Sequence, residues 1–218
     1  IYNVIVNDTT FDSCNATNNG GAVYVIGNNT HIYNCDFNNC IARDAGALYV
    51  DGTGCSLYNS TFTSNMANDD GGAIYWNGDD GVIYNITCIS NKGVSGYDPL
   101  EGKYSSTRGG TICLTGSNVK LLKSTFKSSS AYMDESRNYS KVDGGALFIT
   151  GNGVLVNDTT FDSCTATNNG GAVYVIGNNT RIYNADFTNC AARDGGAIYV
   201  QGDDCKLFNE IKRKLPDP

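Results

Sequence analysis

Histidine, proline and tryptophan are scarce in this sequence, and the scarcity of histidine limits the kinds of metal site that it could contain. The 218 residues include one His, 3 Pro and one Trp. A single His and the absence of any Cys-x-x-Cys pair argue against a zinc site of the usual spacing, and we expect no metal and no cofactor. No apolar run approaches the roughly 20 residues of a membrane-spanning helix, so we expect no span in this segment. The net charge of -7, without a basic stripe, argues against nucleic acid as a partner.

Internal repetition is the strongest signal that is present. Residues 6–59 align without gaps with residues 156–209, with 42 identities in 54 positions. Inside this duplication is a shorter unit of about 25 residues, marked by a phenylalanine and then by a doublet of small residues such as Gly-Gly. The phenylalanines are Phe11, Phe37, Phe62, Phe126, Phe161 and Phe187, with Cys88 in the remaining unit. Seven such units predict a solenoid, because one unit cannot bury its apolar face alone.

The unit has short β-rich segments bounded by Gly, Asn and Asp, and it shows no helical period. We therefore predict an all-β fold, a parallel β-helix of about seven to eight coils with about 25 residues per coil. Neighbouring coils would lie about 4.8 Å apart. Residues 1–209 would form a single domain, and residues 210–218 a non-repeat tail that caps the last coil or begins a linker.

Aligned positions become columns along such a helix, and their chemistry predicts which side chains point inward. Five residues before each phenylalanine stands an aliphatic residue, as at Val6 and Ile32. After each Gly doublet, two aliphatic columns flank an aromatic one, so a period of two puts the aliphatic residues inside and the aromatic ones outside. The reverse facing is also compatible, because all three columns are apolar. The exposed tyrosine ladder would comprise Tyr24, Tyr49, Tyr75, Tyr174 and Tyr199.

Asparagine is expected to serve in turns. Three residues before the phenylalanine position stand Asn34, Asn59 and Asn85, the last of them before Cys88, and this column predicts an amide ladder between coils. Asn59 and Asn85 also lie in Asn-x-Ser/Thr sequons, but as ladder members they are poor glycan acceptors. We expect Asn138, which lies in an insertion, to be the glycosylation site.

The segments FDSC…GGAVY and FTSN…GGAIY resemble the FxxN and GGA[ILV] repeats of the chlamydial polymorphic outer-membrane proteins. They also resemble the adhesin-like surface proteins of methanogenic archaea. The resemblance covers about residues 4–209 and implies a right-handed parallel β-helix in an extracellular, cell-surface protein. In the family's Asn position this chain keeps Asn65 and Asn91 and has cysteine in four other coils, at Cys14, Cys40, Cys164 and Cys190.

Two units are longer than the rest, with extra residues near 92–107 and 130–142. Insertions in a solenoid lie on one face, often the binding face, and these two should stack side by side. They would bring aromatic and acidic side chains to one flank, suited to sugars or to a protein partner. The candidate ligand-binding residues are Tyr97, Asp98, Glu101, Tyr104, Tyr132, Asp134, Glu135 and Tyr139. The insertions are equally compatible with merely covering the turn.

A polar column precedes the Gly doublets and supplies the candidate catalytic residues Asp70, Arg108 and Asp143. Asp44 and Asp70 of this column would lie one coil apart, close to the carboxylate separation found in retaining glycosidases. The structural alternative is that an Asp before Gly-Gly forms an ordinary turn, with Arg108 relieving repulsion between Asp70 and Asp143. We favour this structural interpretation.

The cysteine pairs Cys14/Cys40 and Cys164/Cys190 would lie one coil apart, within the range of a disulfide. Free thiols could equally fill an interior column as small apolar groups. The sequence leaves both states open, and an anaerobic host, which the resemblance implies, would favour the reduced one.

Three functions are compatible with these features. The leading hypothesis is a non-catalytic, adhesin-like segment that acts as a rigid spacer and binds glycans or proteins of other cells. The second is a β-helix enzyme that cleaves polysaccharides, as a lyase or hydrolase. The third is an architectural unit of a surface filament, which self-associates through its terminal coils because exposed strand edges favour pairing.

Overall fold

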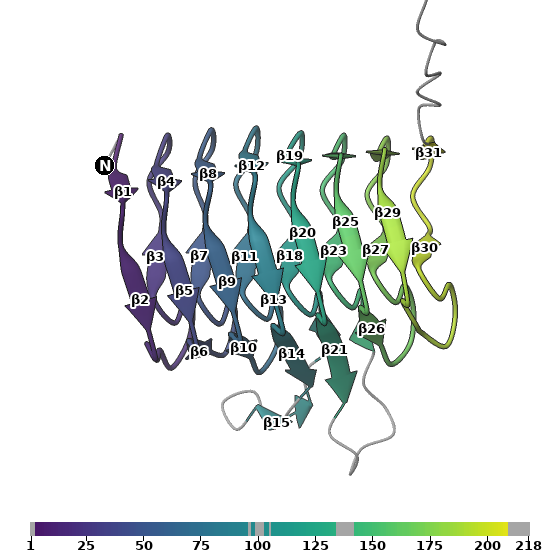
Figure 1. Cartoon of the computed structure of the whole chain (residues 1–218), viewed down its shortest axis with the longest axis horizontal. Coiled ribbons are helices and arrows are strands. Elements are labelled where there is room, and N and C mark those ends of the chain that lie inside the picture. The colour runs from purple at the N-terminus through teal and green to yellow at the C-terminus, as the bar shows by residue number, and fades with distance from the viewer. Residues whose placement is uncertain (1–2, 96, 99–102, 105, 134–141, 209–218) are drawn as a thin grey trace, which may run out of the picture.

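Short parallel strands stacked along one axis make up the computed structural model of the chain (Figure 1). The structure describes residues 3–95, 97–98, 103–104, 106–133 and 142–208. Within these described residues, seven coils follow one another, beginning at Ile5, His31, Ser56, Val82, Lys120, Leu155 and Arg181, and β31 begins an eighth. The predicted all-β parallel β-helix of seven to eight coils is confirmed.

In the described part of the chain, four parallel sheets run along the stack, and each coil contributes one strand to most of them. Sheet 1 contains β1 (Ile5–Asn7), β4 (His31–Tyr33), β8 (Ser56–Tyr58), β12 (Val82–Tyr84), β19 (Lys120–Leu122), β24 (Leu155–Asn157), β28 (Arg181–Tyr183) and β31 (Lys206–Phe208). Sheet 2 contains β2 (Thr10–Asp12), β5 (Asp36–Asn38), β9 (Thr61–Thr63), β13 (Thr87–Ile89), β20 (Thr125–Lys127), β25 (Thr160–Asp162) and β29 (Asp186–Thr188). Sheet 3 contains β6 (Ile41–Ala42), β10 (Met66–Ala67), β14 (Lys92–Ser95), β21 (Ser130–Met133) and β26 (Thr165–Ala166). Sheet 4 contains β3 (Val23–Val25), β7 (Leu48–Val50), β11 (Ile74–Trp76), β18 (Ile112–Leu114), β23 (Leu147–Ile149), β27 (Val173–Val175) and β30 (Ile198–Val200).

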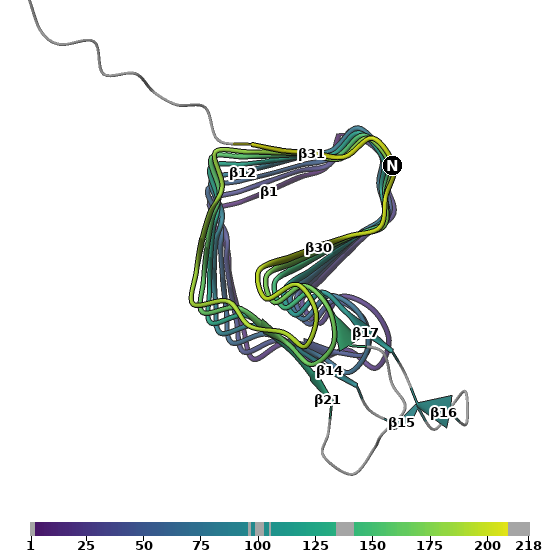
Figure 2. The ribbon, with the colours of Figure 1, turned by 90° about the vertical axis from the view of Figure 1, so that its right-hand side faces the viewer.

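Two smaller pairings lie at the insertions. The strands β15 (Tyr97–Asp98) and β16 (Lys103–Tyr104) form an antiparallel pair, while β17 (Thr107–Arg108) and β22 (Val142–Asp143) pair in parallel. Seen along the axis, the coils superimpose, and β15, β16 and β17 lie at one corner of the cross-section (Figure 2).

Strict register places like residues above one another, and this builds the core. Phe37 pairs with Phe11 on one side and with Phe62 on the other, and the rings stack at centroid distances of 4.9 and 4.6 Å. The predicted inward aliphatic column is buried, as at Ile32 and Leu57. Leu48 and Val50 are buried on either side of the less buried Tyr49, so the predicted facing of sheet 4 is confirmed.

The turn between sheets 1 and 2 holds the expected amide ladder. Asn34, Asn59 and Asn85 all have positive φ, a conformation that Asn tolerates better than most residues. Asn85 Nδ2 donates to Asn59 Oδ1 at 2.9 Å, and Asn59 Nδ2 donates to Asn34 Oδ1 at 3.5 Å. These side chains face solvent, so the ladder orders the turn without entering the core.

A second amide ladder lies inside the coil. Asn65 and Asn91 are fully buried. Asn91 Oδ1 accepts from both the backbone N and Nδ2 of Asn65, at 2.9 and 3.0 Å, while the Nδ2 atoms donate to Phe37 O and Phe62 O. Each buried amide is therefore hydrogen-bonded, as a polar group in a core must be.

Candidate functional site

The two insertions lie side by side, as predicted, because their first strands are paired. β14 and β21 are in parallel register from Lys92↔Ser130 to Ser95↔Met133, and β17 and β22 pair further along each coil. The strands β14 and β21 lie at the same corner of the stack (Figure 2). The described strands of the two insertions therefore form one feature that spans the fourth and fifth coils.

The structure places some of the predicted ligand-binding residues. Tyr132 is 40 % exposed on β21. The backbones of Tyr97 and Asp98 pair with those of Tyr104 and Lys103 in the small hairpin. The remaining candidates lie outside the described residues, as does the predicted glycosylation site: Glu101, Asp134, Glu135, Tyr139 and Asn138.

The column before the Gly doublets is continuous, and its carboxylates link one coil to the next. Asp70 N donates to Asp44 Oδ1 at 3.4 Å, Arg108 N donates to Asp70 Oδ1 at 3.0 Å, and Asn169 N donates to Asp143 Oδ1 at 3.1 Å. The predicted trio Asp70, Arg108 and Asp143 thus lies on three successive coils. Asp70 and Asp143 are buried, and their oxygens accept backbone N–H groups, which is the chemistry of a turn.

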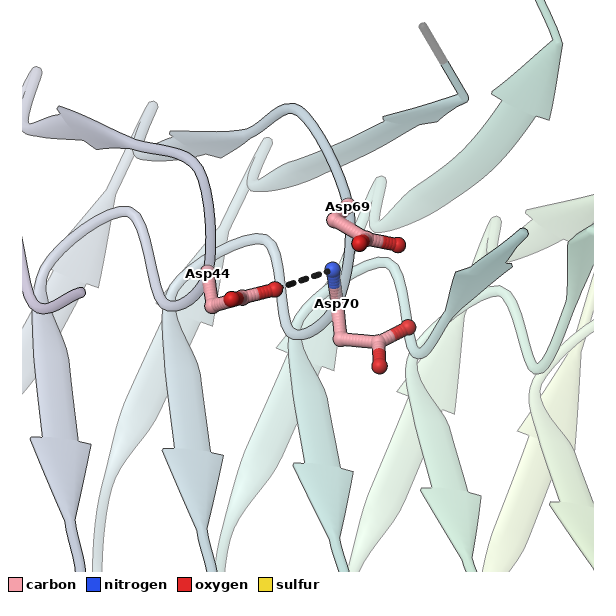
Figure 3. A group of neighbouring side chains, drawn as sticks. All are labelled: Asp44, Asp69 and Asp70. Atoms are coloured by element: carbon pink, nitrogen blue, oxygen red, sulfur yellow. Dashed lines mark hydrogen bonds between the residues drawn. The ribbon is translucent and has the colours of Figure 1, made fainter. Parts of the chain in front are cut away.

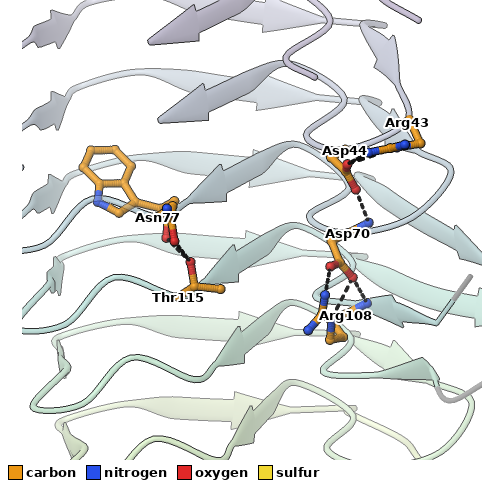
Figure 4. A network of polar contacts seen from close by, with 7 residues as sticks. Arg43, Asp44, Asp70, Asn77, Arg108 and Thr115 are labelled. Carbon is orange, nitrogen blue, oxygen red and sulfur yellow. Dashed lines mark hydrogen bonds and ion pairs between the residues drawn. The ribbon is translucent and has the colours of Figure 1, made fainter. Parts of the chain in front are cut away.

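Arg108 forms an ion pair with Asp70 across the coil boundary (Figure 4). Its Nε donates to Asp70 Oδ1 at 3.0 Å, and its Nη2 donates to Asp70 Oδ2. Burial raises the pKa of Asp70 above its usual value, and the hydrogen bonds and charge of Arg108 oppose that rise. Arg108 therefore stabilises the charged form of Asp70, which the burial of Asp70 disfavours.

Asp69 adds a carboxyl group that the column pattern did not indicate. Oxygens of Asp44, Asp69 and Asp70 lie within 4.8 Å of one another (Figure 3). Burial, followed by the charges of Asp70 and Asp44, raises the pKa of Asp69 to about 8. Asp69 is therefore largely protonated at neutral pH. Its neighbours Asp44 and Asp70 accept hydrogen bonds from Arg43 and Arg108. A cation would have to compete with Arg43, which donates to Asp44 at 3.0 Å, and with Arg108.

The tyrosine column lies beside this acidic column. Burial, followed by the charges of Asp51, Tyr24 and Asp44, raises the pKa of Tyr49 to about 12. The guanidinium carbon of Arg108 lies 5.7 Å from the centroid of the Phe148 ring, which continues the aromatic column. Phenol groups and carboxyl groups thus share one side of sheet 4.

The rings of this column stack on one another, and this changes what they offer a ligand. Tyr49 and Tyr75 are parallel, with an interplanar angle of 0° and centroids 4.8 Å apart. Their faces cover each other, so the column presents ring edges and hydroxyl groups rather than a flat surface for sugar stacking. Tyr24 is 50 % exposed, whereas Tyr49, Tyr75 and Tyr199 are half-buried. Tyr174 is only 6 % exposed and donates to Gln201 Oε1 at 2.7 Å. The expected exposure is therefore found at Tyr24 and is wrong for Tyr174, while the other three rings are exposed only in part.

A second aromatic column was not anticipated. Tyr33, Tyr58 and Tyr84 are paired in register on sheet 1, with Tyr58 and Tyr84 centroids 5.9 Å apart. The signal was present in the sequence, because a tyrosine follows the inward aliphatic residue in four coils. These rings are half-buried on the outer face of a different sheet.

A comparison with protein-family models agrees with this architecture. Residues 3–192 match the family model described as a right-handed β-helix region. The chain belongs to this right-handed β-helix family. The match covers all seven phenylalanine-position residues and both insertions, so the right-handed β-helix continues through the two long coils. Comparisons with curated proteins and with solved structures found no match. Among the described residues, no helix has the length and hydrophobicity to cross a membrane.

Proposed function

We propose that this β-helix is a non-catalytic, adhesin-like segment of the cell surface. It acts as a rigid spacer and binds glycans along the outer side of sheet 4. The observation that carries the proposal is the strip of phenol groups at Tyr24, Tyr49 and Tyr75, which runs beside Asp44. The carboxyl group of Asp69 lies close to that of Asp44. Phenol hydroxyls donate and accept hydrogen bonds, and carboxylates accept them from sugar hydroxyls.

The buried state of Asp70 and Asp143 supports a non-catalytic role. Their carboxylate oxygens accept hydrogen bonds from the next coil, and Asp70 is also held by Arg108. Both residues are therefore used to join coils. The resemblance of the repeats to surface adhesins supports the extracellular location, which limited protease treatment of intact cells would test.

A glycan array tests this proposal through the hydroxyl groups alone. The variant Y49F/Y75F removes two phenol oxygens and keeps the stacked rings, so the fold should persist while glycan binding falls at least tenfold. The matched control is Y58F/Y84F, which removes two phenol oxygens from the other aromatic column and should bind as the parent does. Equal binding by all three proteins, or no binding by the parent, would contradict the proposal.

A second candidate function is polysaccharide cleavage, and the raised pKa of Asp69 favours it. A protonated carboxyl beside a second carboxyl group is the pair that glycoside hydrolysis requires, with one group as acid and the other as base or nucleophile. This candidate predicts release of reducing ends from a polysaccharide panel and its loss in D69N. The leading proposal predicts no release by either protein.

A third candidate is end-to-end association into a filament. Val4, Val6, Val23 and Val25 line an apolar hollow at the first coil, and Ile182, Ile198 and Val200 line one at the seventh. Stacking of a second copy would cover both hollows. Sedimentation velocity tests this association. The parent should sediment faster as its concentration rises, and V200K should reduce that increase. A parent that sediments as a monomer at every concentration would exclude the association.

A further inference from the structure

Two pairs of cysteines occupy the same column on neighbouring coils. Cys14 and Cys40 lie on the first and second coils, and Cys164 and Cys190 on the sixth and seventh. At each pair a backbone hydrogen bond crosses directly between the coils: Ile41 N donates to Cys14 O at 2.9 Å, and Ala191 N to Cys164 O at 3.0 Å. In-register neighbours of this kind lie about 4.8 Å apart, within the Cα separation that a disulfide spans.

The side chains of the later coil reach back toward the earlier one. In the middle coils, Asn65 Nδ2 donates to the carbonyl oxygen of Phe37 in the preceding coil. The thiols approach the equivalent oxygens, with Cys40 Sγ 3.8 Å from Phe11 O and Cys190 Sγ 3.7 Å from Phe161 O. Each of these sulfurs therefore points to the coil that carries its cysteine partner.

The two thiols of a pair differ in access. Cys40 and Cys164 are fully buried, whereas Cys14 and Cys190 are partly exposed. A hydrogen bond from the Cys164 thiol lowers the pKa of Cys190 below the usual value of a thiol, because it stabilises the thiolate. The pair Cys164/Cys190 thus combines one accessible, more acidic thiol with one buried thiol next to it, an arrangement suited to thiol–disulfide exchange. The pair Cys14/Cys40 has the same arrangement of one accessible and one buried thiol.

We propose that each pair is a dithiol site that takes a small disulfide of the glutathione class and closes into a disulfide between coils. The Cys190 thiolate attacks one sulfur of oxidised glutathione, forms a mixed disulfide and expels a glutathione thiolate. Cys164 then loses its proton, and its thiolate attacks the Cys190 sulfur and expels the second glutathione thiolate. The two cysteines lose two electrons and two protons in total, and the glutathione disulfide gains them. Cys14 and Cys40 react in the same way.

This activity goes beyond glycan binding and does not depend on it. The closed bond would join the first coil to the second, and the sixth to the seventh, through a ring of about 25 residues. A cross-link of this kind restricts the unfolded chain, so the oxidised protein should unfold at a higher temperature than the reduced one.

Peptide mapping after oxidation tests the proposal. Trypsin cleaves after Lys141, Arg181 and Arg193, which puts Cys164 and Cys190 on separate peptides with one cysteine each. The folded protein is incubated with oxidised glutathione, alkylated and digested. We expect the two peptides to become linked, with reductant separating them. Unlinked peptides, with Cys190 carrying glutathione or an alkyl group, would overturn the proposal.

Cys205 is the matched control. It is also partly exposed, but the adjacent coil has Thr180 rather than a cysteine in the paired position. It should therefore stop at the mixed disulfide with glutathione. The variant C164S should convert Cys190 to the same behaviour, which separates a resolving role of Cys164 from a merely structural one.

The second pair has its own readout. Cys14 and Cys40 lie on the tryptic peptide that ends at Arg43, together with Cys35. In a C35S variant, oxidation should make this peptide lighter by two hydrogens. A peptide that keeps both hydrogens would exclude this pair, whatever the result at Cys164 and Cys190.

Discussion

Arg108 and Asp70 lie 38 residues apart in sequence, yet the backbone N and the side-chain Nε of Arg108 both donate to the same oxygen of Asp70, each at 3.0 Å. One carboxylate thus joins two coils through the main chain and through a side chain. The sequence separation is large only because the first insertion lies between the two residues.

Removal of the Arg108 side chain should destabilise the fold, because it leaves the buried carboxylate of Asp70 without its ion partner. We expect R108M to lower the free energy of unfolding by about 2–4 kcal/mol, because Asp70 loses its ion partner while remaining buried. The control R193M breaks an exposed ion pair, in which the side chains of Arg193 and Asp194 are 68 % and 54 % accessible. R193M should change the free energy of unfolding by about 0.5 kcal/mol or less. Urea denaturation of the three proteins measures this, and equal losses would show that Asp70 needs no counterion.

Asp69 should make the protein less stable as the pH rises. Its pKa is about 8 in the folded state, above the unfolded value, so the folded chain holds a proton that the unfolded chain releases between about pH 4 and pH 8. Stability from this group is fully present below the unfolded pKa and is lost as the pH rises through 8. Thermal midpoints from pH 4 to 8 should fall more steeply for the parent than for D69N. Parallel curves would contradict the raised pKa.

The second glycine of each doublet should tolerate no side chain where another coil follows it. A Cβ at Gly171 would lie 2.0 Å from Gly196 O and 2.6 Å from Ala191 N, and neither backbone atom can move easily. We expect G171A to cost about 1–3 kcal/mol through overpacking. A Cβ at Gly196 meets nothing closer than Cys190 O at 3.7 Å, so G196A should cost about 0.5 kcal/mol or less. Similar denaturation midpoints for both variants would show that the coils can separate locally.

The buried amide ladder should contribute more than an exposed one. N91A leaves Asn65 without the acceptor for its backbone N and Nδ2, and it leaves Phe62 O without its donor. We expect a loss of about 2–4 kcal/mol, since several buried polar groups lose partners. The control N77A removes an exposed amide that donates to Asp51, and it should cost about 0.5 kcal/mol or less. Guanidinium titration followed by the fluorescence of Trp76 would report both.

The repeating columns made most of the fold predictable. Ile32 and Leu57 were expected to point inward because aliphatic residues recur at their position, and both are buried. Asn34 and Asn59 were expected to form a ladder in a turn, and they do. A column averages the same environment over seven coils, so its chemistry reports burial more clearly than any single residue does.

The candidate site was less predictable because it depends on exceptions to the columns. The pKa of Asp69 follows from the neighbours that surround it, and no repeated position marks that residue. Tyr174 repeats Tyr24 in sequence, yet it lies between Phe148 and Tyr199 and is buried, whereas Tyr24 has a ring neighbour on one side, Tyr49. Identical residues thus differ according to what the adjacent coil supplies.

The register of the coils also determines how the molecule would respond to force. The hydrogen bonds between coils run along the stacking axis, as in Ile41 N to Cys14 O. A pull along that axis loads these bonds in tension, coil by coil, rather than shearing many strands at once. Each coil that opened would release about 80 Å of extended chain. Under load the coils would therefore unfold one after another, and each step would dissipate part of the applied work. A disulfide at each cysteine pair would limit how far the two coils that it joins could extend.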